Sequence, residues 1–316
     1  MAGNSKGVVM AALIANGAIA IMKFVGYLLT ASPAMLSETY HSISDTGNQV
    51  FLLIGIRYGA RDADRRHPFG YGKAQFFFSF LVSVMLFGIA GWESAKHGYH
   101  ALMEGGVHRA SEATLPILEI TFPAVYVNYV VLIGAIVFET YAFVKARKEL
   151  KRQIDVHDWS GYREAFRKTS DVTTLTAFTE DFIALAGAGI ALFGVFLSNV
   201  TANPIYDAAS ALLIGLMLMG FAIALAWENK RLLMGESMPA DEEGKLRDLV
   251  AGWDGVNEVV DLRTVYFGPG EVLVTTDVAF ADTLDTDARE VAIEDIEAAI
   301  REAEPFAERI YVEPVD

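Results

Sequence analysis

The segment GVVMAALIANGAIAIMKFVGYLL, residues 7–29, decides the class of fold. Its only charged residue is Lys23, and the segment is long enough, as an α-helix, to cross a hydrocarbon layer of ~30 Å. A secretory signal peptide has a shorter apolar core and a cleavage site, whereas this run leads after Thr30–Pro33 into a further apolar segment. The sequence therefore predicts a membrane-spanning helix near the start of the chain.

Composition and hydropathy extend this prediction to most of the 316 residues. Hydrophobic residues make up 53% of the chain, and its mean hydropathy is +0.33. The absence of cysteine excludes disulfides, iron–sulfur clusters and thiolate zinc sites. We predict a mainly α membrane protein with lipid as its surroundings. Its six transmembrane helices are expected at about residues 7–29, 34–58, 75–95, 122–144, 173–197 and 205–227.

Basic residues gather in two of the connecting segments. The first extends from Arg57 to Lys73, and the second covers residues 145–171, whereas the connections at 30–33 and 198–204 have none. The positive-inside rule then places both termini in the cytosol, and a bacterial inner (cell) membrane is the simplest location. The long basic segment 145–171 is expected to form a surface helix on anionic headgroups or to bind a partner.

The last part of the chain has a different character. Residues 237–316 contain 21 acidic and 6 basic residues, which accounts for the whole net charge of −15. Their pattern predicts a helix, a hairpin with a Gly-Pro-Gly turn, a second helix and a final strand. We therefore expect a transport domain at 1–236 and a cytosolic α+β domain (α-β-β-α-β, ferredoxin-like) at 237–316. The acidity argues against a nucleic-acid partner, and the chain contains no nucleotide-binding phosphate loop.

Charged side chains inside the predicted spans point to a function. Each costs at least ~2.5 kcal/mol in hydrocarbon and so requires a reason. In His41-Ser-Ile-Ser-Asp45 the two ionisable side chains share one helix face, where an imidazole and a carboxylate can both bind one divalent cation. Glu180 and Asp181 lie within another span and can complete such a site. The alternative is that His41 and Asp45 only hydrogen-bond to each other between helices.

Other polar residues within the spans have more ordinary interpretations. Asn16 and Asn48 are expected to bridge helices by hydrogen bonds. Glu139 is either a group on a cation pathway or the partner of Lys23, and the sequence does not separate the two.

Four stretches resemble a known family. They are Met35–Gln49 (MLSETYHSISDTGNQ), Asp64–Gly72 (DRRHPFGYG), Thr179–Gly187 (TEDFIALAG) and Asn203–Ser210 (NPIYDAAS). Together with the six spans and the acidic tail, they are similar to the cation diffusion facilitator family, and to its branch with a mitochondrial zinc transporter. The resemblance implies a homodimeric antiporter that exports a divalent metal ion from the cytosol in exchange for protons.

The resemblance also implies a ligand set. His41, Asp45 and Asp181 fall on three of the family's four transport-site positions, and the fourth is occupied by Ala177, which has no ligand atom. Glu180, water or a group from another span would have to complete the shell. In an accessory site in the loop after span two, Tyr71 stands where some members have histidine. The tail has no histidine at all.

These residues favour Zn²⁺ as the transported substrate, because imidazole and carboxylate ligands together suit zinc better than a hard cation. Metal requires neutral His41 and ionised carboxylates, so metal and protons compete for one site and H⁺ can act as the counter-ion. No resident cofactor is expected. Two alternatives are an intramembrane metallohydrolase, with Glu180 as its general base, and a metal sensor that does not transport.

Overall fold

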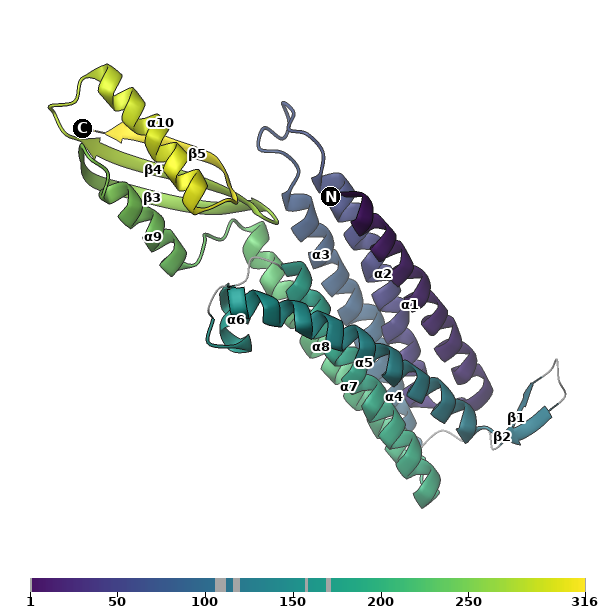
Figure 1. The fold of residues 1–316 in the computed structure, drawn as a ribbon. Helices are drawn as coiled ribbons and strands as arrows, with labels where there is room; N and C mark the ends of the chain where they lie inside the picture. The colour runs from purple at the N-terminus through teal and green to yellow at the C-terminus, as the bar shows by residue number, and fades with distance from the viewer. Residues whose placement is uncertain (1, 106–111, 116–119, 157–158, 169–171, 316) are drawn as a thin grey trace. The chain divides into compact units, whose positions relative to one another are not determined.

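The computed structural model describes residues 2–105, 112–115, 120–156, 159–168 and 172–315 (Figure 1). Contacts within the chain divide it into two units. The first comprises residues 1–54 and 78–228, and the second comprises residues 55–77 and 229–316. The first unit contains the bundle of long helices, and the second contains the C-terminal sheet with its helices.

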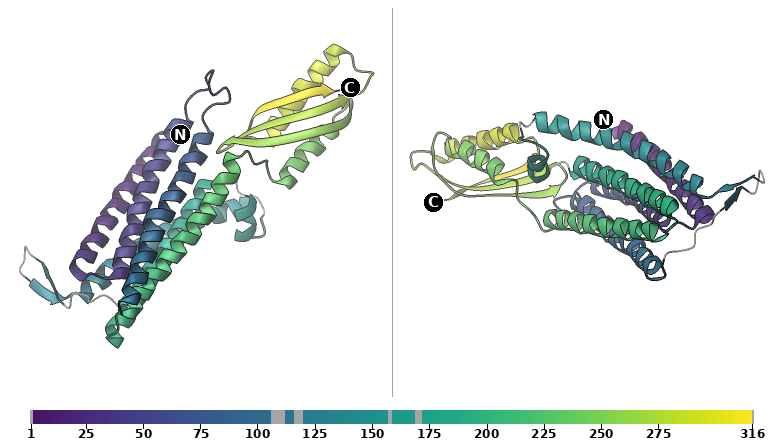
Figure 2. Two further views of the ribbon diagram at one scale, coloured as in Figure 1. Left: turned by 180° about the vertical axis from the view of Figure 1, so that it is seen from behind. Right: turned by 90° about the horizontal axis from the view of Figure 1, so that it is seen from below.

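Long helices form the first unit and run side by side along a common direction (Figures 1 and 2). They follow the predicted spans, with ends that differ by a few residues except in α3–α4 and α5. Their bounds are α1 Ala2–Thr30, α2 Pro33–Gly59, α3 Lys73–Met85, η1 Leu86–Trp92, α4 Glu93–Met103, α5 Val125–Val156, α7 Val172–Thr201 and α8 Ile205–Leu233. The segment η1 is a π-helical stretch, so that α3, η1 and α4 form one continuous helix.

The hydropathy of these helices identifies a membrane domain. Within the described residues, four helices are long and apolar enough to cross a bilayer, namely Lys73–Met103, Val125–Val156, Ala177–Thr201 and Ile205–Leu233. Large apolar side chains such as Val130 and Phe193 are exposed on the outside of the bundle, as expected for lipid-facing positions. A core of small and branched residues, including Leu132, Val195 and Leu218, is fully buried inside it.

The segment 145–171 differs from its prediction. Its first part is not a separate surface helix but the continuation of α5 as far as Val156, and only the short α6, Tyr162–Lys168, follows. Helix α5 therefore extends twelve residues beyond the predicted end of its span at residue 144. The charged residues after Val144 still favour helix, because Lys, Arg, Glu and Gln have high helix propensity. The change from apolar to charged residues after Val144 therefore marks the end of the apolar stretch, whereas the helix itself continues to Val156.

Glycines allow a very close approach between α4 and α8. A Cβ atom on Gly98 would collide with the backbone of Leu212, and one on Gly215 would collide with the backbone of Ala95. Small residues at such crossings let two membrane helices make extensive van der Waals contact. The arrangement fixes α8 against the third span.

The second unit contains a three-stranded mixed sheet. Strand β3, Val256–Gly268, pairs antiparallel with β4, Glu271–Phe280, and β4 pairs parallel with β5, Ala307–Val315. Helix α9, Ala240–Ala251, packs on β3, and α10, Thr286–Ala303, packs on β5 (Figure 1). The predicted order α-β-β-α-β is confirmed. An additional short hairpin, β1 Glu112–Leu115 with β2 Ile120–Pro123, was not predicted.

One face of this sheet forms the core of the C-terminal domain. The alternate residues Val272, Val274, Val278 and Phe280 of β4 are buried, as their period of two predicts. Ile296 and Ile300 of α10 are fully buried, and Asp285 caps this helix by accepting a hydrogen bond from the Ala288 backbone N–H. The fold of this domain follows directly from local sequence patterns.

Candidate functional site

Helices α2 and α7 bring acidic side chains together inside the bundle. The carboxyl groups of Asp45 on α2 and Glu180 on α7 are neighbours at the interface of these two helices. Asn48, one turn after Asp45, donates a hydrogen bond of 2.8 Å from Nδ2 to Oε1 of Glu180. This is the interhelical bridge that the sequence predicted for Asn48. It orients the Glu180 carboxyl group toward α2.

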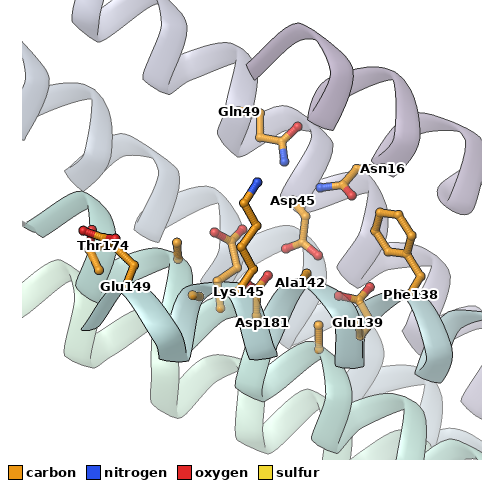
Figure 3. A pocket seen from close by; sticks show the side chains of 14 residues that line it. Asn16, Asp45, Gln49, Phe138, Glu139, Ala142, Lys145, Glu149, Thr174 and Asp181 are labelled. Carbon is orange, nitrogen blue, oxygen red and sulfur yellow. The ribbon is translucent and has the colours of Figure 1, made fainter. Parts of the chain in front are cut away.

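Asp45 and Glu180 line a cavity of about 390 Å³ between α1, α2, α5 and α7. Figure 3 shows Asp45, Glu139 and Asp181 reaching into it from three different helices, with Asn16 of α1 beside Asp45. The complete lining is Asn16, Asp45, Gln49, Phe138, Glu139, Ala142, Lys145, Ala146, Glu149, Thr174, Ala177, Glu180, Asp181 and Ala184. Three of the four predicted metal ligands, all except His41, therefore face one cavity.

The charge of the lining selects for cations. Five of the lining residues are acidic and only Lys145 is basic. A concave surface with one sign of charge and low-dielectric walls raises the local concentration of the opposite ion. Glu139 belongs to this lining, and the ion-pair partner of Lys23 is Glu38. A role of Glu139 on a cation pathway stays a prediction.

His41 lies just beyond the cavity. Its side chain is buried on α2, and its Nδ1 is 3.5 Å from Oδ1 of Asp45, beyond ordinary N–H···O hydrogen-bond distance. Neither of its ring nitrogens has a hydrogen-bond partner among the residues that the structure describes. Among the residues that the structure describes, no three histidine, aspartate or glutamate side chains lie close enough together to hold one metal ion. In this conformation the predicted ligands are near one another but do not form a complete coordination shell.

Ala177 lines the same cavity one turn before Asp181. The position at which the family resemblance places a fourth ligand therefore faces the expected space, but with a methyl group. Glu180 lines the same cavity, and its carboxyl group accepts a hydrogen bond from Asn48 of α2.

The loop between α2 and α3 contains the possible accessory site. The Asp64 carboxylate accepts hydrogen bonds from the Tyr71 hydroxyl, at 2.8 Å, and from the backbone N–H groups of Arg66 and His67. These bonds, that of Tyr71 first, hold the pKa of Asp64 below its usual range. Tyr71 therefore uses one carboxylate oxygen of Asp64, and the backbone uses the other.

One buried group was missed by sequence reasoning. Glu38 on α2 forms an ion pair with Lys23 of α1 at 2.7 Å, and both side chains are completely buried. The signal was available, because Glu38, His41 and Asp45 follow one another at helical spacing on the same face of α2.

Comparison with known proteins identifies the family. Residues 9–234 match the cation efflux transmembrane domain, which is well over half of the chain. The chain belongs to the cation efflux, or cation diffusion facilitator, family. This family consists of transporters and not of enzymes, so the intramembrane hydrolase considered above is excluded for this chain.

Individual relatives have moderate identity. The human proton-coupled zinc antiporter SLC30A9, mitochondrial, is 29% identical over 273 residues, which are 86% of this chain and 45% of the human protein. Metal tolerance protein C4 of Arabidopsis thaliana is 26% identical, over 88% of this chain and 57% of the plant protein. The cation-efflux pump FieF of Citrobacter koseri is 23% identical, over 92% of this chain and 86% of that pump. The chain thus spans about half the length of the first two relatives.

Proposed function

We propose that this integral membrane protein is a proton-coupled exporter of divalent metal ions, with Zn²⁺ as its preferred substrate. The observation that carries the proposal is the meeting of Asp45 and Glu180 from two helices at a strongly acidic cavity inside the membrane domain. Relatives named zinc antiporter and cation-efflux pump support both the substrate class and the coupling. The imidazole of His41 next to these carboxylates favours zinc over harder cations.

The proposed ligands are His41, Asp45, Glu180 and Asp181. All four must lose protons or stay neutral when metal binds, so each metal ion that enters releases protons and each proton that enters weakens metal binding. A relative movement of α2 and α7 would bring the ligands together and expose the site to the two sides of the membrane in turn. Proton-driven export follows from this competition without a nucleotide.

The arrangement that we propose has six spans, both termini in the cytosol and a second copy of the chain as partner. Helices α1 and α2 contain 29 and 27 residues, or ~40 Å at 1.5 Å per residue, and so can also cross a bilayer. The basic loops support the orientation, with a bacterial cell membrane as the location. On the outer sheet face, Leu273 is only partly buried and Tyr311 is 54% exposed, which supports dimerisation of the acidic domain.

Flux measurements test the proposal. Purified protein in liposomes that contain a zinc indicator should accumulate Zn²⁺ when a proton gradient is imposed, and Asp45→Asn should abolish this accumulation. Lipid vesicles without protein and the variant Glu149→Gln, which changes a carboxyl group at the other end of the cavity, serve as controls. Zinc binding without any flux under either direction of gradient would identify the sensor alternative instead.

A further inference from the structure

The buried ion pair between Lys23 and Glu38 is not part of the proposed transport site. Lys23 Nζ donates a hydrogen bond of 2.7 Å to Oε2 of Glu38, and neither side chain is exposed at all. Removing two charges from water costs several kcal/mol per ion, and their mutual attraction often does not exceed this cost. A fully buried pair inside a membrane domain is therefore weak evidence for a stabilising role, and a functional role has to be considered.

Half of the Glu38 carboxylate is unoccupied. Its Oε1 is buried and has no hydrogen-bond partner among the described residues. This oxygen points toward α7, where a Cβ atom on Gly187 would lie only 2.7 Å from it. Glycine at position 187 thus leaves the room that the carboxylate occupies between α2 and α7. Buried carboxylate oxygens nearly always have a partner, so the free oxygen requires an explanation.

His41 offers a second unoccupied ligand on the same helix face. It follows Glu38 by three residues, a spacing that places side chains next to each other on an α-helix. Both ring nitrogens are buried without a partner, and the His41 side chain is only 1% exposed. A carboxylate and an imidazole at this spacing are a pair that binds divalent cations such as zinc.

The position of this pair relative to the cavity suggests a sequence of binding events. The cavity is lined by Asp45 of α2 and Ala184 of α7. Glu38 lies seven residues from Asp45, or ~10 Å along α2, and Gly187 lies ~5 Å beyond Ala184 along α7. A cation that leaves the cavity along the interface of these two helices therefore meets His41 and then Glu38. In this structure Lys23 already supplies a positive charge there.

We propose that Glu38, together with His41, which it shares with the transport site, forms a second station for the transported divalent cation, which the ammonium group of Lys23 occupies as a tethered cation when no metal is there. The inference rests on the proposed transport function. Metal arriving from the cavity displaces Lys23 from Glu38, and Lys23 returns when the metal leaves. Because one cation always replaces another, the Glu38 carboxylate is never left without a counter-charge. While no metal is bound at the station, Lys23 keeps the path closed.

Exchange of the two charges separates this role from a structural one. The double variant Lys23→Glu/Glu38→Lys keeps a buried ion pair between α1 and α2 but removes the carboxylate from α2. We expect its melting temperature to stay close to that of the wild type and the zinc affinity of the cavity to stay within about threefold. Zinc flux into proteoliposomes should fall at least tenfold. Flux at the wild-type rate would overturn the proposal. Loss of cavity affinity would also overturn it, because the pair would then act on the cavity and not as a station.

Binding measurements test the same proposal without transport. In an Asp45→Asn background, which disables the cavity site, Lys23→Met should bind one more Zn²⁺ per chain than the same background with both Lys23→Met and Glu38→Gln. If Lys23→Met lowers the melting temperature, added Zn²⁺ should restore it only while Glu38 is present. Equal zinc binding and equal zinc response in the two variants would refute the station. Failure of the wild type to bind or transport zinc would instead refute the proposed function, which keeps the two conclusions distinguishable.

Discussion

The substitution Glu180→Gln tests which acidic residue of α7 binds the metal. Family spacing assigns this role to Asp181, whereas the structure places the carboxyl group of Glu180 against Asp45. Glutamine keeps the volume of the side chain and an oxygen that can accept the hydrogen bond from Asn48, so the variant removes little except the negative charge. The comparison between Glu180→Gln and Asp181→Asn is therefore a comparison of charges at two positions of one helix.

The expected effect follows from Coulomb's law. A divalent ion and a carboxylate ~4 Å apart attract by ~8 kcal/mol at an effective dielectric constant of ~20. Desolvation of a bound ion and rearrangement of water offset part of this attraction, which leaves about 3 kcal/mol, and each 1.4 kcal/mol changes an equilibrium constant about tenfold. We therefore expect Glu180→Gln to weaken zinc binding on the order of 100-fold. Asp181→Asn should weaken it on the order of 10-fold, because Asp181 also lines the cavity, whereas it is Glu180 that Asn48 orients toward α2.

Calorimetric titration of Zn²⁺ into protein in lipid nanodiscs at pH 7 measures these affinities, and proton-driven flux measures their consequence. Glu149→Gln is the matched control, since it removes a carboxylate from the same cavity but ~15 Å farther along α5 than Glu139. Its affinity should stay within about threefold of the wild type. Wild-type affinity in Glu180→Gln, together with a large loss in Asp181→Asn, would show that our assignment of the α7 ligand is wrong.

Three further changes test other parts of the molecule. His41→Asp replaces the imidazole of the proposed site by a carboxylate, so paired flux measurements should show a Zn²⁺/Mn²⁺ ratio at least about tenfold below that of the wild type; an unchanged ratio would mean that His41 does not contact the ion. Tyr71→Phe removes the hydroxyl that lowers the pKa of Asp64, so NMR titration should show this pKa rising toward 3.8. Because the pKa of Asp64 is lower in the folded than in the unfolded chain, its carboxylate stabilises the folded loop at pH values above the unfolded pKa, and this stabilisation is lost as the pH falls through the folded pKa. The variant should therefore lose less stability in acid than the wild type. Identical acid titrations would contradict the hydrogen bond between Tyr71 and Asp64. Gly98→Ala places a methyl group against the backbone of Leu212 and should lower the free energy of unfolding by about 1–3 kcal/mol, whereas Gly88→Ala, with open space around it, should change it by less than about 1 kcal/mol in denaturant titrations.

Several elements of the fold could be predicted from the sequence because their signals are local. A run of apolar residues of sufficient length indicates a span wherever it occurs, and the alternation in β4 indicates which face of the sheet is buried. The Gly-Pro-Gly turn and Asp285 before α10 mark element ends by their own backbone and capping preferences. The continuation of α5 to Val156 escaped prediction because hydropathy reports burial in lipid, whereas helix formation depends on backbone hydrogen bonds.

The sequence by itself determined that His41, Asp45, Glu180 and Asp181 lie inside helices of a membrane domain, where charge is costly and predicts a function. Only the tertiary structure decided which of them meet. Two adjacent residues on α7 differ by ~100° in direction, so the rotation of that helix against α2 determines that Glu180 reaches Asp45 and Asn48. The packing of the helices likewise determines that Lys23 forms its ion pair with Glu38 and not with Glu139. These choices depend on contacts between helices far apart in the sequence, and no spacing along a single helix contains that information.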